Sequence, residues 1–121
     1  VTIIATGHLV WEALEACKTL QEQGISAGVI NIHTIKPLDA AAILKSVAIT
    51  GCVVTAEEHN YLGGLGESVS RILAENNPVP QEFVATKDTF GESGTPDQLM
   101  DKYGLNAAAI VKAATKVVAR K

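Results

Sequence analysis

The sequence predicts an α/β fold, a three-layer α/β/α sandwich on a mainly parallel sheet of four to five strands. Two observations indicate this class. Short runs rich in β-branched residues alternate with longer segments in which apolar residues recur at helical spacing. Because right-handed crossovers between such strands pass through helices, they give a parallel sheet covered on both faces. For the strands present we expect the spatial order 2-1-3-4.

The first half of the chain begins with a predicted strand, Val1–Thr6, which is bounded by Gly7. A helix is expected from His8 until Gly24, which is suited to end it in the left-handed conformation. Ile25–Ile32 is predicted as a second strand, nearly apolar, as strands covered on both faces are. The apolar face predicted for the helix contains Val10, Ala13, Leu14, Cys17 and Leu20.

The middle of the chain contains a predicted loop, His33–Pro37, followed by a helix that Asp39 caps. This helix should run through Ile49 and end at Gly51. Cys52–Ala56 is the third predicted strand. The side chains expected to point inward from the helix are those of Ile43, Leu44 and Val47.

A third helix is predicted to start near Gly66 and to stop at Asn76-Asn77-Pro78. Gln81–Thr86 follows as a weaker fourth strand. The apolar residues of this helix are Val69, Ile72 and Leu73.

The last part of the chain begins with a polar loop, Lys87–Gly94. Thr95-Pro96-Asp97-Gln98 has the pattern of a helix start, and that helix should end at Gly104. Asn106 is expected to cap a final helix that reaches about Ala119. Its predicted apolar side contains Ile110, Ala114, Val117 and Val118.

Size and composition limit the function classes. The 121 residues suit a single domain, 1–121, and 47% hydrophobic residues suffice for a core without disulfides or metal. Cys17 and Cys52 fall on apolar positions, so we expect buried thiols of a reducing cytoplasm. With 4% aromatic residues, a charge of −3 and no apolar run near the roughly 18 residues of a membrane span, neither nucleic-acid nor membrane partners are expected.

The candidate functional residues follow the first and third strands. In the order 2-1-3-4 these strands are neighbours and the chain leaves them toward opposite faces, which opens a crevice at the carboxyl edge of the sheet. We expect Thr6-Gly7-His8 to face Glu57-Glu58-His59 there. The candidate crevice or interface residues are Gly7, His8, Glu57, Glu58, His59, Asn60, Gly63, Gly64 and Gly66.

Acid/base catalysis and metal binding are the first alternatives for these side chains. Adjacent residues that leave a strand point to alternate sides, which argues against convergence of Glu57, Glu58 and His59. A charged imidazole at His8 is disfavoured because a helix begins there. No His-x-x-x-His or Cys-x-x-Cys spacing supports a metal site. We therefore favour helix capping, pairing with basic residues, or a surface shared with another domain, and predict no catalytic, cofactor-binding or metal-binding residue.

Gly63-Gly64-Leu65-Gly66 could bind phosphate, because glycines before a helix expose amides to anions. The segment lacks the spacing of known phosphate loops. We favour the alternative that glycine serves positive φ angles and close backbone packing. Trp11 and Tyr61 are expected to be exposed at the same edge, as interface aromatics often are.

Four motifs together resemble the C-terminal domain of transketolase and its thiamine-diphosphate relatives. His8 stands where the family more often has Ser, and the resemblance covers almost the whole chain. The motifs are ATG at Ala5–Gly7, TIKPLD at Thr34–Asp39, VTAEEH at Val54–His59 with GGLGE at Gly63–Glu67, and SGTP at Ser93–Pro96 with YGL at Tyr103–Leu105.

The resemblance implies transfer of a two-carbon ketol unit between sugar phosphates, with thiamine diphosphate and Mg²⁺, in the pentose phosphate pathway. Enzymes of this family have three α/β domains and form homodimers. The first two domains bind cofactor and substrate. The third, which this chain resembles, supports the dimer and is thought to be regulatory. No catalytic residue is therefore carried over, and no cofactor is expected in this chain.

The chain departs from the family in lacking the two preceding domains and an antiparallel edge strand before Val1. We expect an excised fragment, inactive alone, whose partners are the remaining domains on the same chain or on a separate N-terminal subunit. Two alternatives within the superfamily are the C-terminal domain of a 2-oxo acid dehydrogenase β chain or of deoxyxylulose-phosphate synthase. Outside it, a stand-alone flavodoxin-like anion-binding module and a purely structural interaction domain remain.

Overall fold

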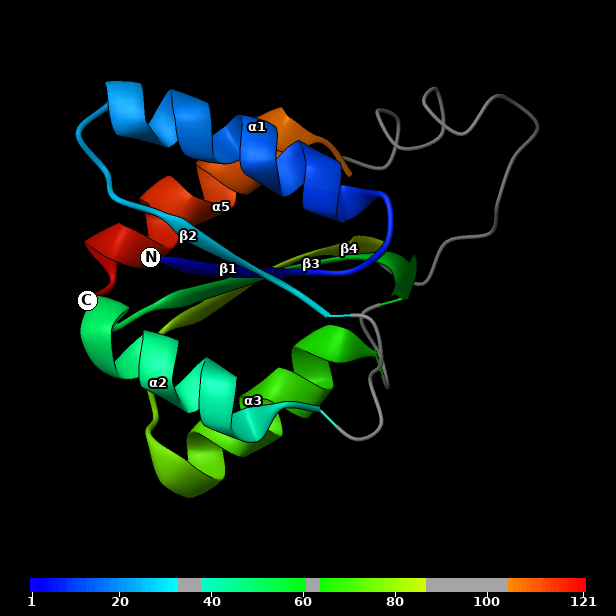
Figure 1. Ribbon diagram of the computed structural model, residues 1–121, viewed down its shortest axis with the longest axis vertical. Coiled ribbons are helices and arrows are strands. Elements are labelled where there is room, and N and C mark those ends of the chain that lie inside the picture. The colour runs from blue at the N-terminus through cyan, green and yellow to red at the C-terminus, as the bar shows by residue number, and fades with distance from the viewer. Residues whose placement is uncertain (33–37, 61–63, 87–104) are drawn as a thin grey trace.

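The computed structural model describes residues 1–32, 38–60, 64–86 and 105–121, which form a three-layer α/β/α sandwich (Figure 1). The sheet has the strand order β2-β1-β3-β4, and every neighbouring pair is parallel. This confirms the predicted order. The strands are β1 (Thr2–Ala5), β2 (Gly28–Asn31), β3 (Val53–Asn60) and β4 (Gln81–Thr86).

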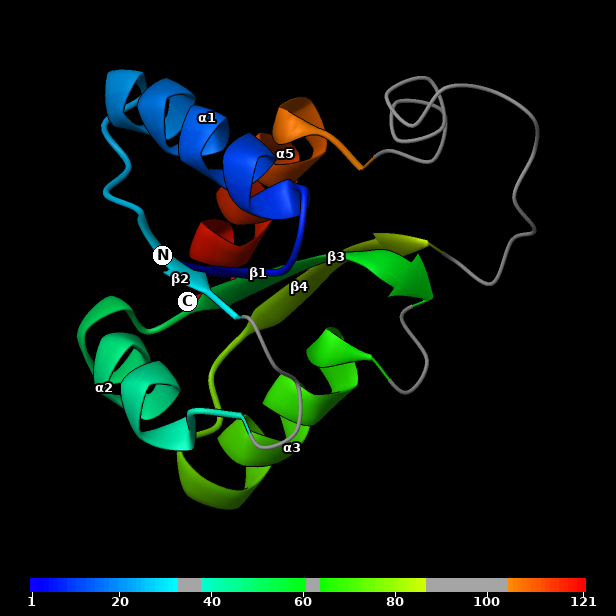
Figure 2. The ribbon, with the colours of Figure 1, turned by 45° about the vertical axis from the view of Figure 1, so that its right-hand side comes forward.

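The helices cover both faces of the sheet. The first and last helices lie side by side on one face, and the two middle helices lie on the other (Figures 1 and 2). The chain thus leaves β1 and β3 toward opposite faces, as predicted. The helices are α1 (Leu9–Glu22), α2 (Ala40–Thr50), α3 (Leu65–Asn76) and α5 (Ala107–Ala119).

Helix ends follow the capping residues that the sequence indicated. The Asp39 carboxylate accepts the Ala42 N–H at 3.1 Å, and Gly51 ends α2 with φ 74°. Asn106 Oδ1 accepts the Ala109 N–H at 2.9 Å at the start of α5. These side chains satisfy amides that the first turn of a helix leaves without partners.

The core lies in two clusters on opposite faces of the central strands. Neighbouring residues of β1 point alternately into them, so that Ile3 is buried under α1 and α5 while Ile4 is buried under α2 and α3. On β3, Val54 belongs to the first cluster and Val53 to the second. All four side chains are fully buried.

Three burial predictions were wrong, one of them that of a buried Cys17 thiol, since Cys17 is only half-buried. Leu14 is 47% exposed, because the buried stripe of α1 begins at Leu9 and leaves Leu14 outside it. The second strand is shorter than the predicted Ile25–Ile32 and is only half-buried, because β2 stands at the edge of the sheet. The buried stripe of α1 consists of Leu9, Ala13, Ala16 and Leu20.

Several predictions lie outside the described residues. These are the loops His33–Pro37 and Lys87–Gly94, the helix from Thr95 to Gly104, and the placement of Tyr61 and Gly63.

Candidate interface at the carboxyl edge of the sheet

The ends of β1 and β3 meet at the carboxyl edge of the sheet. Ala5 pairs with Ala56, and the Thr6 N–H donates to the Ala56 carbonyl oxygen at 3.2 Å. Gly7, with φ 56°, then turns the chain into α1, a conformation that favours glycine. Exposed Gly7 and His8 thus lie at the same edge as the residues that follow Ala56, where the sequence placed them.

The third strand was predicted to end at Ala56, and this was wrong. The strand continues to Asn60. Asn60 pairs with Thr86 of β4, and the register shifts between Ala56 and Asn60. Three residues of β3 therefore stand opposite one residue of β4, as in a β-bulge. The polar residues Glu57–Asn60 belong to the strand because β4 still offers a partner beyond the apolar run.

Glu57 is the buried polar group at this edge, with a residue exposure of 1%. Its Oε1 accepts the Leu65 N–H at 2.8 Å, and its Oε2 accepts the Gly66 N–H at 2.7 Å. Both amides belong to the first turn of α3, where Gly64 has no side chain to cap the helix. The carboxylate also lies at the positive end of the helix dipole. Helix capping, the favoured alternative, is confirmed for Glu57.

Gly66 allows α3 to approach the sheet closely. A Cβ atom there would overlap the ring of Phe83 and lie 3.1 Å from Thr55 Oγ1. The close-packing role predicted for glycine is thus confirmed at Gly66. A positive φ angle was also predicted for these glycines, and this was wrong. Gly64 has φ −96°, and Gly66 lies within helix α3.

A phosphate-binding role for this turn conflicts with the same geometry. The two amides that would face an anion, those of Leu65 and Gly66, already bind the Glu57 carboxylate. The chain itself therefore supplies the negative charge that a helix start attracts. These two amides are therefore not available to an outside anion.

Gln81 anchors the first turn of α3 at a second point. Its Nε2 donates to the Gly66 carbonyl at 3.0 Å and to Thr55 Oγ1 at 3.2 Å. Its Oε1 lies 2.7 Å from Ser70 Oγ, one helical turn further along α3. The helix start is thus tied to both β3 and β4.

On the face of the sheet that α1 and α5 cover, a second carboxylate binds a helix start, and the sequence analysis did not predict this contact. Glu12 of α1 accepts the N–H of Ala107, the first residue of α5, at 3.0 Å. Glu12 lies outside the apolar face that was predicted for its helix. Its partner is 95 positions away, so no local signal marked it.

Among the described residues, no group of three His, Cys, Asp or Glu side chains could hold a metal ion. The exposed Trp11 of α1, at 65%, agrees with its predicted position on the surface.

In the described parts of the chain, no helix has the length and apolar character that crossing a membrane requires.

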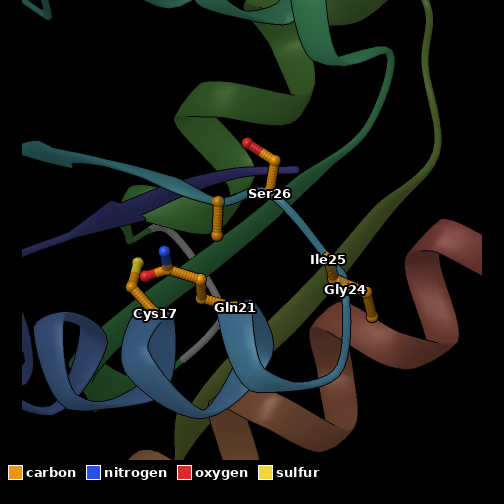
Figure 3. A pocket seen from close by; sticks show the side chains of 6 residues that line it. Cys17, Gln21, Gly24, Ile25 and Ser26 are labelled. Atoms are coloured by element: carbon orange, nitrogen blue, oxygen red, sulfur yellow. The ribbon is translucent and has the colours of Figure 1, made fainter.

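A cavity of about 500 Å³ lies beside the segment that leads from the end of α1 to the start of β2 (Figure 3). Cys17 and Gln21 of α1 line it on one side, and Ser26 lines it on the other. Burial raises the pKa of the Cys17 thiol, so the thiol stays protonated and is a weak nucleophile. Both cysteines are free, but only Cys52 is fully buried as predicted.

A sequence profile described as "Transketolase, C-terminal domain" matches residues 1–110. The chain is 51% identical, over its whole length, to the 6-deoxy-6-sulfo-D-fructose transketolase subunit SqwH of Clostridium sp. (strain MSTE9), of which it covers 38%. It is 44% identical over 92% of its length to a putative transketolase C-terminal section of Methanocaldococcus jannaschii, of which it covers 34%. With 1-deoxy-D-xylulose-5-phosphate synthase 1 of Geobacter sulfurreducens it shares 42% identity, over all of the chain and 19% of that protein.

Solved structures show the same fold. A structure described as "Split gene transketolase, inactive beta4 tetramer" matches 98% of the chain and 39% of its own length, with a TM-score of 0.93 and 45% identity. A transketolase of Pichia stipitis matches 98% of the chain and 16% of its own length, with a TM-score of 0.66 and 22% identity, which speaks for the fold alone.

Proposed function

Because the chain belongs to the transketolase C-terminal domain family, we propose that it is the supporting domain of a transketolase. Such an enzyme transfers a two-carbon ketol unit between sugar phosphates with thiamine diphosphate and Mg²⁺. The chain spans 38% and 34% of the length of two relatives. The remaining domains, on the same chain or on a separate subunit, complete the enzyme. We propose that this enzyme acts in the pentose phosphate pathway in the cytoplasm.

The observation that carries this proposal is the similarity to separately encoded transketolase sections. At 51% and 44% identity, two such sections match 100% and 92% of this chain. The split-gene structure agrees with the fold at a TM-score of 0.93. The fold alone would not suffice, because doubly wound α/β sheets serve many functions.

The chemistry of the described residues supports a role outside catalysis. Glu57, the buried carboxylate of the candidate edge, is engaged by the amides of α3. We therefore place thiamine diphosphate and Mg²⁺ on the other domains. The carboxyl edge, with Gly7, His8 and the segment 58–60, is then the surface that meets a neighbouring domain or subunit.

Self-association belongs to the same proposal. The split-gene relative was solved as a tetramer of β chains that is described as inactive. We expect this chain likewise to associate without activity when the remaining portion is absent. The full enzyme is expected to be a homodimer of the complete catalytic unit.

The direct test is an assay of ketol transfer between sugar phosphates with thiamine diphosphate and Mg²⁺. The protein that contains this chain is assayed alone and then mixed with the missing transketolase portion. We expect no activity alone and activity after mixing. Turnover by the chain alone would contradict the assignment of the cofactor to other domains.

A second candidate is the C-terminal domain of deoxyxylulose-phosphate synthase, which the 42% identity to the Geobacter enzyme favours. Synthesis of deoxyxylulose phosphate by the same mixture, without ketol transfer, would select it. The identity is higher to the transketolase sections, so ketol transfer is the expected outcome.

A further inference from the structure

We propose that Glu57 is a positioning residue: its buried carboxylate fixes the bulge of β3 against the start of α3 and so sets the geometry of the candidate interface. This inference rests on the proposed function, because it concerns the surface that meets the rest of the enzyme. It assigns Glu57 no contact with substrate or cofactor.

Glu57 stands where the hydrogen bonds of the sheet constrain β3 least. Pairing between β3 and β4 is regular from Val53 to Ala56 and resumes only at Asn60. Glu57 is the first residue after the regular ladder. Since a bulge lacks the ladder bonds that set strand geometry, other contacts have to fix it.

The Glu57 carboxylate makes such contacts with definite geometry. Its two oxygens accept from two consecutive amides, those of Leu65 and Gly66, at 2.8 and 2.7 Å. A carboxylate held at both oxygens has little freedom to rotate or shift. The start of the bulge and the start of α3 are therefore fixed relative to each other.

The candidate residues 58–60 and Gly64 lie within the span fixed in this way. Residues 58–60 continue β3 from Glu57, and Gly64 directly precedes the two donor amides. Gly7 and His8 lie at the same edge, after β1. A shift of the bulge would displace the backbone that presents 58–60 without reaching the middle of the sheet.

Helix α3 has anchors that do not involve Glu57. Val69 and Leu73 are buried in the core, and Gln81 binds the Gly66 carbonyl. A Glu57 variant should therefore keep the helix packed and lose mainly the position of the bulge. This separates a positioning role from a role in overall stability.

The test compares Glu57→Gln with Asp39→Ala in the assembled transketolase that contains this chain. Asp39 also accepts a helix amide, but at the start of α2, so its variant controls for the loss of a cap. In Glu57→Gln, the new side chain is close in size to the carboxylate, but its NH₂ group presents a donor to one helix N–H. The readouts are the dissociation constant of the assembly by analytical ultracentrifugation, kcat at saturating protein, and the KM for thiamine diphosphate.

We expect Glu57→Gln to raise the dissociation constant by about tenfold, a change equal to roughly 1.4 kcal/mol. The kcat of the saturated assembly and the KM for thiamine diphosphate should stay within about twofold of the wild-type values, since Glu57 binds no reacting group. Asp39→Ala should leave all three quantities unchanged.

Glu57→Ala adds a readout that a general loss of stability would not give. Acetate or formate should enter the vacated space, bind the two amides and restore assembly. Neither anion should help Glu57→Gln, in which the side chain still fills the space, or Asp39→Ala. If Glu57→Gln does not fold, this rescue decides the matter alone: restored assembly supports the proposal, and restored folding without assembly overturns it.

The inference is overturned if Glu57→Gln and Asp39→Ala change the dissociation constant equally, or if the former lowers kcat of the saturated assembly. Failure of the wild-type protein to form an active assembly would instead overturn the proposed function. The two failures are therefore distinguishable.

Discussion

At the scale of single residues, the direction in which Gly66→Ala changes the free energy of unfolding tests how closely α3 packs on the sheet. Alanine is favoured over glycine within a helix by about 1 kcal/mol, so Gly66→Ala would stabilise an unobstructed helix. Here the new Cβ would overlap the Phe83 ring. Overpacking typically costs about 1–3 kcal/mol, so we expect urea denaturation to show a free energy of unfolding lowered by about 1 kcal/mol.

A double-mutant cycle checks the cause of that loss. Phe83→Ala combined with Gly66→Ala should recover most of the stability lost through the overlap. Gly28→Ala is a matched control, because a Cβ there meets no atom within 4 Å. Stabilisation by Gly66→Ala alone would show that the Phe83 side chain, 42% exposed, moves aside without cost.

Residues whose partners are close in sequence could be predicted, and those with distant partners could not. Asp39 and Asn106 each accept an amide three positions ahead, so the local pattern marked both as caps. Glu57 reaches amides eight and nine positions away across a turn, and its role remained one of several alternatives. Glu12 binds an amide of α5, which only the packing of two helices brings near.

At the scale of elements, β3 shows why a sequence pattern can misplace the end of a strand. The apolar run ends at Ala56 and four polar residues follow, which indicated the edge of the sheet. The strand continues because β4 provides a pairing partner as far as Thr86. Strand length depends on the neighbour as well as on the side chains of the strand itself.

The start of α5 provides the prediction at this scale. Asn106→Ala removes the side-chain oxygen that accepts the Ala109 N–H, and loss of such a cap costs about 1 kcal/mol. We expect the melting temperature to fall, and amide exchange within the first turn of α5 to become faster than in α2. Asn106→Ser, which keeps a capping oxygen, should resemble the wild type, and equal losses in both variants would argue against capping.

At the scale of the whole molecule, the order of strands followed from the alternation of elements, since right-handed crossovers leave few arrangements. The degree of burial did not follow in the same way. Leu14 and the second strand looked like core, but the orientation of α1 and the position of β2 at the sheet edge leave them partly exposed. Periodicity identifies which side of a helix or strand is apolar, but it does not show how much of that side neighbouring elements cover.

The two core clusters share the central strands, and this gives a prediction for cooperativity. Ile3 and Ile4 are adjacent on β1, fully buried, and belong to different clusters. Ile3→Ala and Ile4→Ala should each lower the free energy of unfolding by about 2–5 kcal/mol. Because one sheet joins both clusters, circular dichroism and tryptophan fluorescence should report a single shared transition in each variant. Separate transitions for the two faces would contradict this.

The central position of β1 also has a consequence for how the protein is made. Both neighbours of β1 come later in the chain, and Thr2 pairs with Gly28 on one side and with Val53 on the other. On the ribosome, the apolar run of β1 therefore emerges before either partner, and it can pair on both sides only after the chain has been synthesised beyond Ala56. Contacts of such long sequence separation form slowly, and unpaired apolar strands tend to aggregate. During synthesis, β1 thus lacks its full set of strand partners until β3 has emerged.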